Sequence, residues 1–429
     1  MGLAHLVCLL VGCGGEPKVA PESSEVLVAS PTPEAEGPQR WSAANIKLLK
    51  PARPEIASQT QLPLRPDQGI QRAMDTLTSV VDTYARDPGD PWALGHGLLA
   101  HGASMQLADG RSAVDHLFSE YARVFDANGH EFIYFPKSVD GTLIQPHSEL
   151  LLKAITESEL APDTPIQVEG RQFTAADLYR GTLLRTYLDA PTNHSSFAST
   201  NDMPWALQAI AAWAPASLDW TASDGTQMSL NTLTDFNAVV LRKETRFLAQ
   251  AFAKKASFKK QRQGIYQYTC GGAHLIQGVS FAVARGYGHA RGHALIAEQG
   301  MLALFRMQVE LEQIDAAVKA QPAVAFQLHV QRLKLTGHTL ETLHKMSAAG
   351  QFSKDSKAQK ALEWVAAEVV RSVALLDGHK AFEKLQTIKD KDLQLFRDIV
   401  GDACHALRGL KLATGQAQVR LYTSPPTTP

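Results

Sequence analysis

The sequence has no excess of charge of either sign. Its 42 lysines and arginines nearly balance 43 aspartates and glutamates over 429 residues, which gives a formal net charge of −1. Proteins whose main partner is a nucleic acid usually carry a basic surplus, so this balance argues against such a partner. Hydrophobic residues make up 45% of the chain and charged residues 20%, the composition of a soluble globular protein.

Cysteine is scarce, and several common sequence motifs are missing. Of the four cysteines, only Cys270 and Cys404 lie outside the first 13 residues. Two cysteines do not make a disulfide scaffold, so stability must come from a hydrophobic core. The chain also lacks the P-loop, GxGxxG, GxSxG, HExxH and EF-hand patterns. Their absence argues against nucleotide binding and against the commonest hydrolase and metalloprotease classes.

The N-terminus carries the most specific signal in the chain. The apolar run LVCLLVGCGG contains Leu10-Val11-Gly12-Cys13, which resembles the lipobox of bacterial lipoproteins. The resemblance implies that residues 1–12 are a signal peptide and that the Cys13 thiol carries a diacylglycerol after cleavage. It also implies a membrane-anchored protein of the cell envelope, in the outer membrane if the organism is Gram-negative. The n-region MGLAH departs from the usual secretory pattern because it has no lysine or arginine.

The residues that follow Cys13 predict a tether and then a helical domain. Residues 13–40 are rich in proline, glutamate, serine and alanine, and they contain too few apolar side chains to fold. Residues 41–66 remain proline-rich and are expected to lie extended over the body. The helical domain is predicted over 67–415, with a subdivision near residue 290 as an option. A disordered tail is expected over 416–429.

Apolar spacing predicts a mostly α-helical fold. Ile70, Met74, Leu77 and Val81 recur at helical intervals. Further helices are expected at 111–123, 148–157, 174–188, 204–213, 229–256, 271–286, 293–318, 322–348, 357–376 and 390–411, and small β-hairpins at 130–144 and 164–173. The tetrapeptide PWAL occurs at 91–94 and at 204–207. This repetition favours a helical repeat such as an α/α toroid, with a multi-helix bundle as the alternative.

The stretch YTCGGAHLI, at 268–276, predicts the main chemical site. Cys270 is expected at a helix N-terminus, where the helix dipole favours the thiolate, and His274 lies one turn later on the same face. The two residues are candidate metal ligands, with zinc as the expected ion and a third ligand from another helix. They are equally a candidate thiol nucleophile and base. A buried thiol beside a core histidine is the alternative without chemistry.

The same residues carry a second resemblance. A Cys-Gly-Gly-x-His sequence at the start of a helix is similar to the inner helices of zinc-bearing or cyclase-related α/α toroids, the prenyltransferase/cyclase-like proteins. The similarity covers five residues. It implies an open zinc site within a ring of helices, and it does not extend to the Asp-rich motif of terpene cyclases.

Three further residues are catalytic candidates beside His274. His96 lies between two glycines within PWALGHGLLAHG, and His194 and Asp202 lie in the polar loop TNHSSFASTND before a helix. Helix capping is the alternative role for Asp202. Two alternative functions follow from these residues. One is a metal-dependent or thiol-dependent hydrolase or lyase; the other is a non-catalytic envelope lipoprotein that binds a small molecule, glycan, lipid or protein on a concave helical surface.

Overall fold

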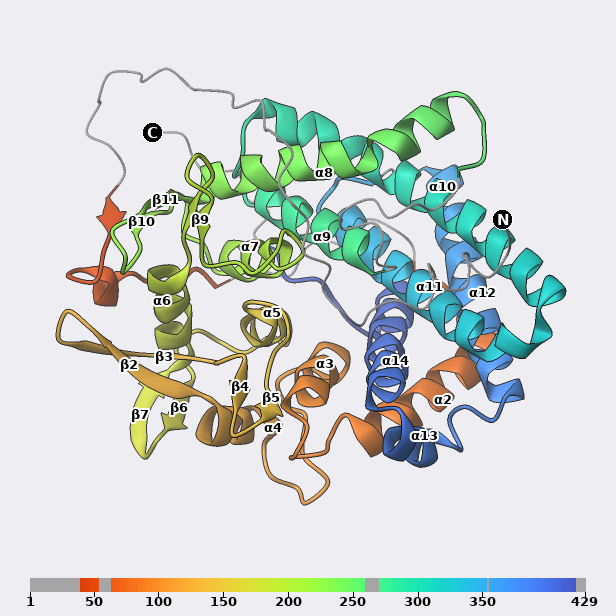
Figure 1. The fold of residues 1–429 in the computed structure, drawn as a ribbon, viewed down its shortest axis with the longest axis horizontal. Coiled ribbons are helices and arrows are strands. Elements are labelled where there is room, and N and C mark those ends of the chain that lie inside the picture. Colours follow the sequence, from red (N-terminus) through yellow and green to blue (C-terminus); the bar gives the residue numbers. More distant parts are fainter. Residues whose placement is uncertain (1–38, 54–62, 259–269, 353–354, 422–429) are drawn as a thin grey trace.

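The computed structural model describes residues 39–53, 63–258, 270–352 and 355–421. Cys13 and almost all of the predicted tether lie outside these residues. Within them, long helices accompany a few short strand pairs (Figure 1). The mostly helical fold class is confirmed, and closure of the helices into a toroid stays a prediction. None of the helices in the described ranges combines the length and the apolar character that a membrane crossing needs.

The N-terminal half alternates short helices with strand pairs. Its helices are α2 (Gln68–Tyr84), α3 (Pro91–His101), α4 (Ala113–His116), α5 (Leu150–Glu157), α6 (Ala175–Arg185) and α7 (Met203–Ala212), with short turns η1 (Ile46–Leu48) and η2 (Leu117–Tyr121). The antiparallel pairs are β2 (Arg123–Ala127) with β3 (His130–Tyr134), β4 (Ser138–Val139) with β5 (Thr142–Leu143), β6 (Pro165–Val168) with β7 (Arg171–Thr174), and β8 (Leu188–Asp189) with β9 (His194–Ser195). A three-stranded sheet joins β1 (Arg40–Trp41), β10 (Asp219–Thr221) and β11 (Gln227–Ser229).

The tight turns of two strand pairs each consist of an acidic residue followed by glycine. Asp140 and Gly141 connect β4 to β5, and Glu169 and Gly170 connect β6 to β7; all four have positive φ. Two consecutive left-handed residues match the twist of a tight hairpin. The hairpin expected at 130–144 would pair β3 with the segment that follows it. Instead β3 pairs with β2, the strand before it.

The C-terminal half consists of long helices. They are α8 (Leu230–Ala253), α9 (Gly271–Ala284), α10 (Ala290–Ala320), α11 (Ala325–Ala348), α12 (Ser356–Gly378), α13 (Leu385–Lys391) and α14 (Leu393–Ala413), with a short turn η4 (Pro322–Val324) before α11. Figure 1 shows them gathered on the side of the molecule opposite the hairpins. One core cluster contains residues from Ile46 to Leu421, and therefore from both sides of residue 290. Val419 and Leu421, in the segment where a tail was expected, are buried in that core.

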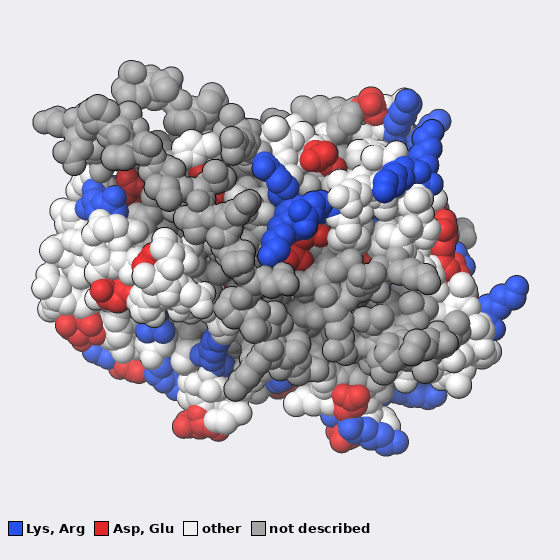
Figure 2. Space-filling model, turned by 45° about the horizontal axis from the view of Figure 1, so that its top comes forward, with Lys and Arg blue, Asp and Glu red and all other residues white. Residues whose placement is uncertain are grey.

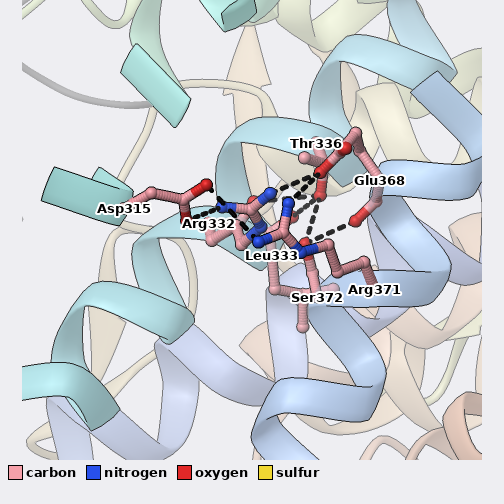
Figure 3. A network of polar contacts seen from close by, with 7 residues as sticks. All are labelled: Asp315, Arg332, Leu333, Thr336, Glu368, Arg371 and Ser372. Atoms are coloured by element: carbon pink, nitrogen blue, oxygen red, sulfur yellow. Dashed lines mark hydrogen bonds and ion pairs between the residues drawn. The ribbon is translucent and has the colours of Figure 1, made fainter. Parts of the chain in front are cut away.

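Helix α11 is the central element of this half. It packs against α9, α10, α12 and α14. Polar contacts fix its first half to the two neighbouring helices (Figure 3). The buried guanidinium of Arg332 donates to Asp315 of α10 at 2.7 Å and also pairs with Glu368 of α12. One turn later, the hydroxyls of Thr336 and Ser372 lie 3.2 Å apart.

Helices α11 and α14 run parallel and touch backbone to backbone. Their contacts join residues at a nearly constant separation along the chain, such as Lys334 with Asp398 and Gly337 with Ala406. A Cβ atom added to Gly337 would lie 3.1 Å from the Cα of Ala406, and one on Gly409 would lie 3.2 Å from a backbone nitrogen of α11. These glycines therefore permit the close approach that brings polar side chains of the two helices together.

Candidate metal centre

Three buried histidines from three helices converge at the centre of the long-helix half. They are His274 of α9, His338 of α11 and His405 of α14, and each is at most 4% exposed. One ligand nitrogen from each lies within 4.8 Å of the other two. The ring centroids are 3.9 Å apart for His338 and His405, and 5.0 Å apart for His274 and His338. Nitrogen ligands on a tetrahedral zinc ion are about 3.4 Å apart, so only a small closing movement of the rings is needed.

Two of these rings have buried nitrogen atoms without partners. Nδ1 of His274 and Nδ1 of His338 are enclosed, and neither has a hydrogen-bond partner within the described part of the chain. Buried polar atoms of native proteins are nearly always paired, because desolvation without a partner costs about 1–3 kcal/mol. A metal ion among the three rings would satisfy such nitrogens.

Each histidine of the α11–α14 pair faces a carboxylate on the other helix. Nδ1 of His405 donates a hydrogen bond of 2.6 Å to Oε2 of Glu341. In the opposite direction, Nε2 of His338 lies 3.7 Å from Oδ1 of Asp402. Metal-binding histidines usually direct the nitrogen that does not bind the ion towards a carboxylate or carbonyl group. This cross-helix arrangement leaves Nε2 of His405 and Nδ1 of His338 for an ion.

A chain of buried charges extends from Glu341 to α5. Nζ of Lys345 lies 2.6 Å from Glu341 and 2.5 Å from Glu157, and Lys153 lies 2.9 Å from Glu157 on the other side. Gln277 of α9 accepts a further hydrogen bond from Lys345, at 3.0 Å. Because the positive and negative groups alternate, each buried charge has a close partner of opposite sign.

Burial sets the protonation state of the site. It lowers the pKa of His274 and of His338 well below the ordinary value, and it lowers the pKa of His405, so all three rings are neutral at pH 7. The neutral imidazole is the form that binds metal ions. Burial alone would raise the pKa of Glu341, but Lys345 and His405 outweigh burial and hold that pKa well below its usual range.

The repeated PWAL sequence forms two walls of the site. Both copies begin helices with proline in the first turn, at Pro91 for α3 and Pro204 for α7. The ring of Trp205 lies against His274, with centroids 3.9 Å apart. The ring of Trp92 lies 4.1 Å from that of His96, which in turn contacts His405 edge to face at 5.4 Å. Similar helix starts thus bring Trp205 against the histidine cluster and Trp92 against His96 beside it.

The structure brings some of the predicted site residues together and leaves others apart. His274 is a member of the cluster and His96 lies beside it. Asp202 is connected to it indirectly: its Oδ1 lies 3.0 Å from Nδ1 of His147, whose ring stacks on Trp205. Although Asp202 occupies the N-cap position of α7, its side chain makes no capping hydrogen bond there.

His194 and Cys270 are placed differently. The ring of His194 is half exposed in β9, where it pairs with Asp224 and stacks on Tyr187. Cys270 is at the N-cap of α9, as expected, and its backbone oxygen accepts from the amide of His274. It forms no disulfide, and the group of candidate ligands contains His274 without Cys270.

Sequence reasoning did not select His338 or His405, although the spacing of α11 carries a signal for His338. Lys334, His338, Glu341 and Lys345 follow one another at intervals of four, three and four residues. This spacing places four ionisable side chains on one face of a helix that the rest of the pattern predicts to be buried. Buried ionisable groups need partners, so such a stripe indicates a polar centre.

Comparisons with known proteins add no relative: no protein-family model matches the chain, and neither curated proteins nor solved structures gave a significant match. The interpretation of the site therefore depends on its geometry alone.

Proposed function

We propose that the protein is a zinc-dependent enzyme of the cell envelope, a hydrolase or lyase, whose ion is held by His274, His338 and His405. The observation that carries the proposal is the convergence of three neutral imidazoles from α9, α11 and α14, two of them with unpartnered nitrogens. Three nitrogen ligands leave the fourth position of a tetrahedral zinc ion for water or substrate.

Bound zinc would lower the pKa of its water and supply a nucleophile at neutral pH. The protein's contribution is to orient the ligands. Glu341 holds the tautomer and the ring plane of His405 through the 2.6 Å hydrogen bond, and Asp402 faces His338 in the same sense. His96, beside His405, is the first candidate for contact with a ligand in the site. His147, oriented by Asp202 and 29% exposed, lies towards the solvent.

Metal analysis of purified protein tests the proposal. Wild-type protein expressed with zinc should contain about one ion per chain, and His338→Ala should contain almost none. His194→Ala is a matched control because it removes a half-exposed histidine outside the cluster. Equal and substoichiometric metal in all three proteins would eliminate the metal centre.

The envelope location is the second part of the proposal. It is supported by the lipobox-like sequence that ends at Cys13 and by the proline-rich residues that follow it. Two lipid chains give stable anchoring where one does not. In a bacterial host, the wild-type chain should fractionate with membranes and incorporate labelled fatty acid, and Cys13→Ser should do neither. Retention of the variant in membranes would contradict lipidation at Cys13.

A purely structural metal ion is the second candidate function, and the enclosure of the three rings favours it. Each histidine is at most 4% exposed, and together they join three helices that contribute to the core. The body would then be a non-catalytic lipoprotein stabilised by zinc. Cobalt substitution distinguishes the two: azide should shift the visible spectrum of an ion with an open position, and an unchanged spectrum would indicate a closed, structural site.

A further inference from the structure

The outer face of α8 carries a cationic stripe: Arg242, Lys243 and Arg246, continued by Lys254 and Lys255 at the helix end. All five side chains are exposed. None of them makes a side-chain hydrogen bond or ion pair with a described residue. Figure 2 brings the α8 side of the molecule forward and shows lysine and arginine side chains standing out on it.

The first three cations of the stripe share one face of the helix. Residues 239, 242, 243 and 246 are separated by three or four positions, which places them within about 100° around the axis. Val239, on that face, is 58% exposed. The two acidic residues of α8 do not neutralise the stripe: Asp235 pairs with His289, and Glu244 lies on another side of the helix and has its own contact.

The stripe gathers positive charge on one helix face of a chain that is close to neutral as a whole. Lysine and arginine balance aspartate and glutamate almost one for one overall, and many other basic side chains are in ion pairs, for example Arg171, Arg332 and Lys345. Stabilisation of the helix dipole accounts for Lys254 and Lys255, which are at the C-terminus of α8. It does not account for Arg242, Lys243 and Arg246, which are in the middle of the helix.

We propose that the outer face of α8 docks on an anionic membrane surface through Arg242, Lys243 and Arg246. The three cations span about 6 Å along the helix, and Lys254 and Lys255 extend the positive charge to about 20 Å, which matches a plane of phosphate headgroups. The exposed Val239 fits the boundary between headgroups and acyl chains, into which small apolar side chains of interfacial helices insert. The contact would orient the helical body on the membrane, and it is independent of the metal centre.

Vesicle co-sedimentation tests the docking surface without the lipid anchor. The full chain carrying Cys13→Ser is mixed with phosphatidylcholine vesicles, or with vesicles containing 30% phosphatidylglycerol, at low and high salt. Binding is expected to the anionic vesicles only and to weaken with salt. Arg242→Gln, Lys243→Gln and Arg246→Gln together should reduce the affinity, by roughly fivefold for each cation removed.

A matched variant distinguishes binding through the α8 stripe from a general effect of the protein's net charge. Lys357→Gln, Lys360→Gln and Lys384→Gln remove the same number of exposed cations away from α8. Two of them lie on α12 and the third directly precedes α13. This control should bind as the parent does. The proposal is overturned by equal binding to neutral vesicles, by no binding to anionic ones, by an unchanged affinity of the α8 variant, or by an equal loss in the α12 control.

Discussion

Glu341 and His405 are hydrogen-bonded at 2.6 Å although 64 residues separate them in the chain. His338 and Asp402 are separated by the same 64 residues and face each other with the roles exchanged. Each of the parallel helices α11 and α14 therefore supplies one candidate ligand and the carboxylate that orients the ligand of the other. For the proposed metal ion, this reciprocity predicts a binding affinity that depends on both carboxylates.

Removing the charge of Glu341 is the most direct test of that dependence. Glu341→Gln keeps an acceptor for His405 but withdraws the negative charge, so zinc affinity should fall by about 10–100-fold while the fold is retained. Competition with a coloured chelator measures the affinity. Glu383→Gln, at an exposed position, is the control and should bind zinc as the wild type does. Unchanged affinity of Glu341→Gln would mean that His405 does not bind the ion.

Cys270→Ala and His405→Ala distinguish the metal centre from the pair predicted by sequence. If the ion is held by the three histidines, Cys270→Ala should keep its full metal content and His405→Ala should lose it. Elemental analysis of the two purified variants decides the matter. Loss of metal from Cys270→Ala alone would restore Cys270 as a ligand.

Because α11 and α14 are in close contact, a larger side chain between them should lower the free energy of unfolding. Gly337→Ala places a methyl group about 3 Å from the backbone of Ala406, so the free energy of unfolding should decrease by about 1–3 kcal/mol. Gly378→Ala, at the end of α12, meets nothing within 4 Å and should be neutral or slightly stabilising. Urea unfolding monitored by circular dichroism compares the two. A stable Gly337→Ala protein would show that the helices separate readily.

His344 predicts a loss of stability in acid. Burial lowers the pKa of this ring to about 4, from an unfolded value of about 6.5. Between pH 6.5 and 4 the His344 ring binds a proton in the unfolded chain but not in the native one. The free energy of unfolding is therefore unaffected by this ring above pH 6.5 and decreases as the pH falls from 6.5 to 4. Wild-type protein should lose about 2 kcal/mol more than His344→Leu between pH 7 and 4.5 in urea unfolding.

A surface histidine serves as the control for that pH dependence. His130 is exposed in β3, so His130→Gln should retain the acid sensitivity of the wild type. Equal sensitivity of wild-type protein and His344→Leu would show that the His344 ring accepts a proton without cost in the native state.

Local patterns predicted much of the fold. The helix expected from the spacing of Ile70 to Val81 forms as α2, and the hairpin expected at 164–173 forms as β6 and β7. Both depend on residues a few positions apart. The partner of β3 was not predicted correctly. Either the segment before β3 or the one after it could pair with its backbone groups, and packing outside the strand determines which one does.

The site was predictable only in part for the same reason. His274 was predicted because it lies one helical turn after Cys270, and His96 because two glycines flank it; both lie at the cluster. His338 and His405 are in uninterrupted helices, and their meeting depends on the parallel packing of α11 and α14, which the apolar spacing of each helix does not specify. His194 was predicted from its place in a polar loop before a helix, yet it is half exposed and pairs with Asp224.

The parallel run of α11 and α14 also determines when an ion can bind during folding. The three histidines span 274–405, so no nascent chain that stops before α14 contains all of them, and closing so long a loop is slow. Uptake of the proposed zinc ion would then be a late event, possible only after α14 has docked beside α11. Chains that fail to dock their last long helix would remain metal-free, and they would be recognisable by that property alone.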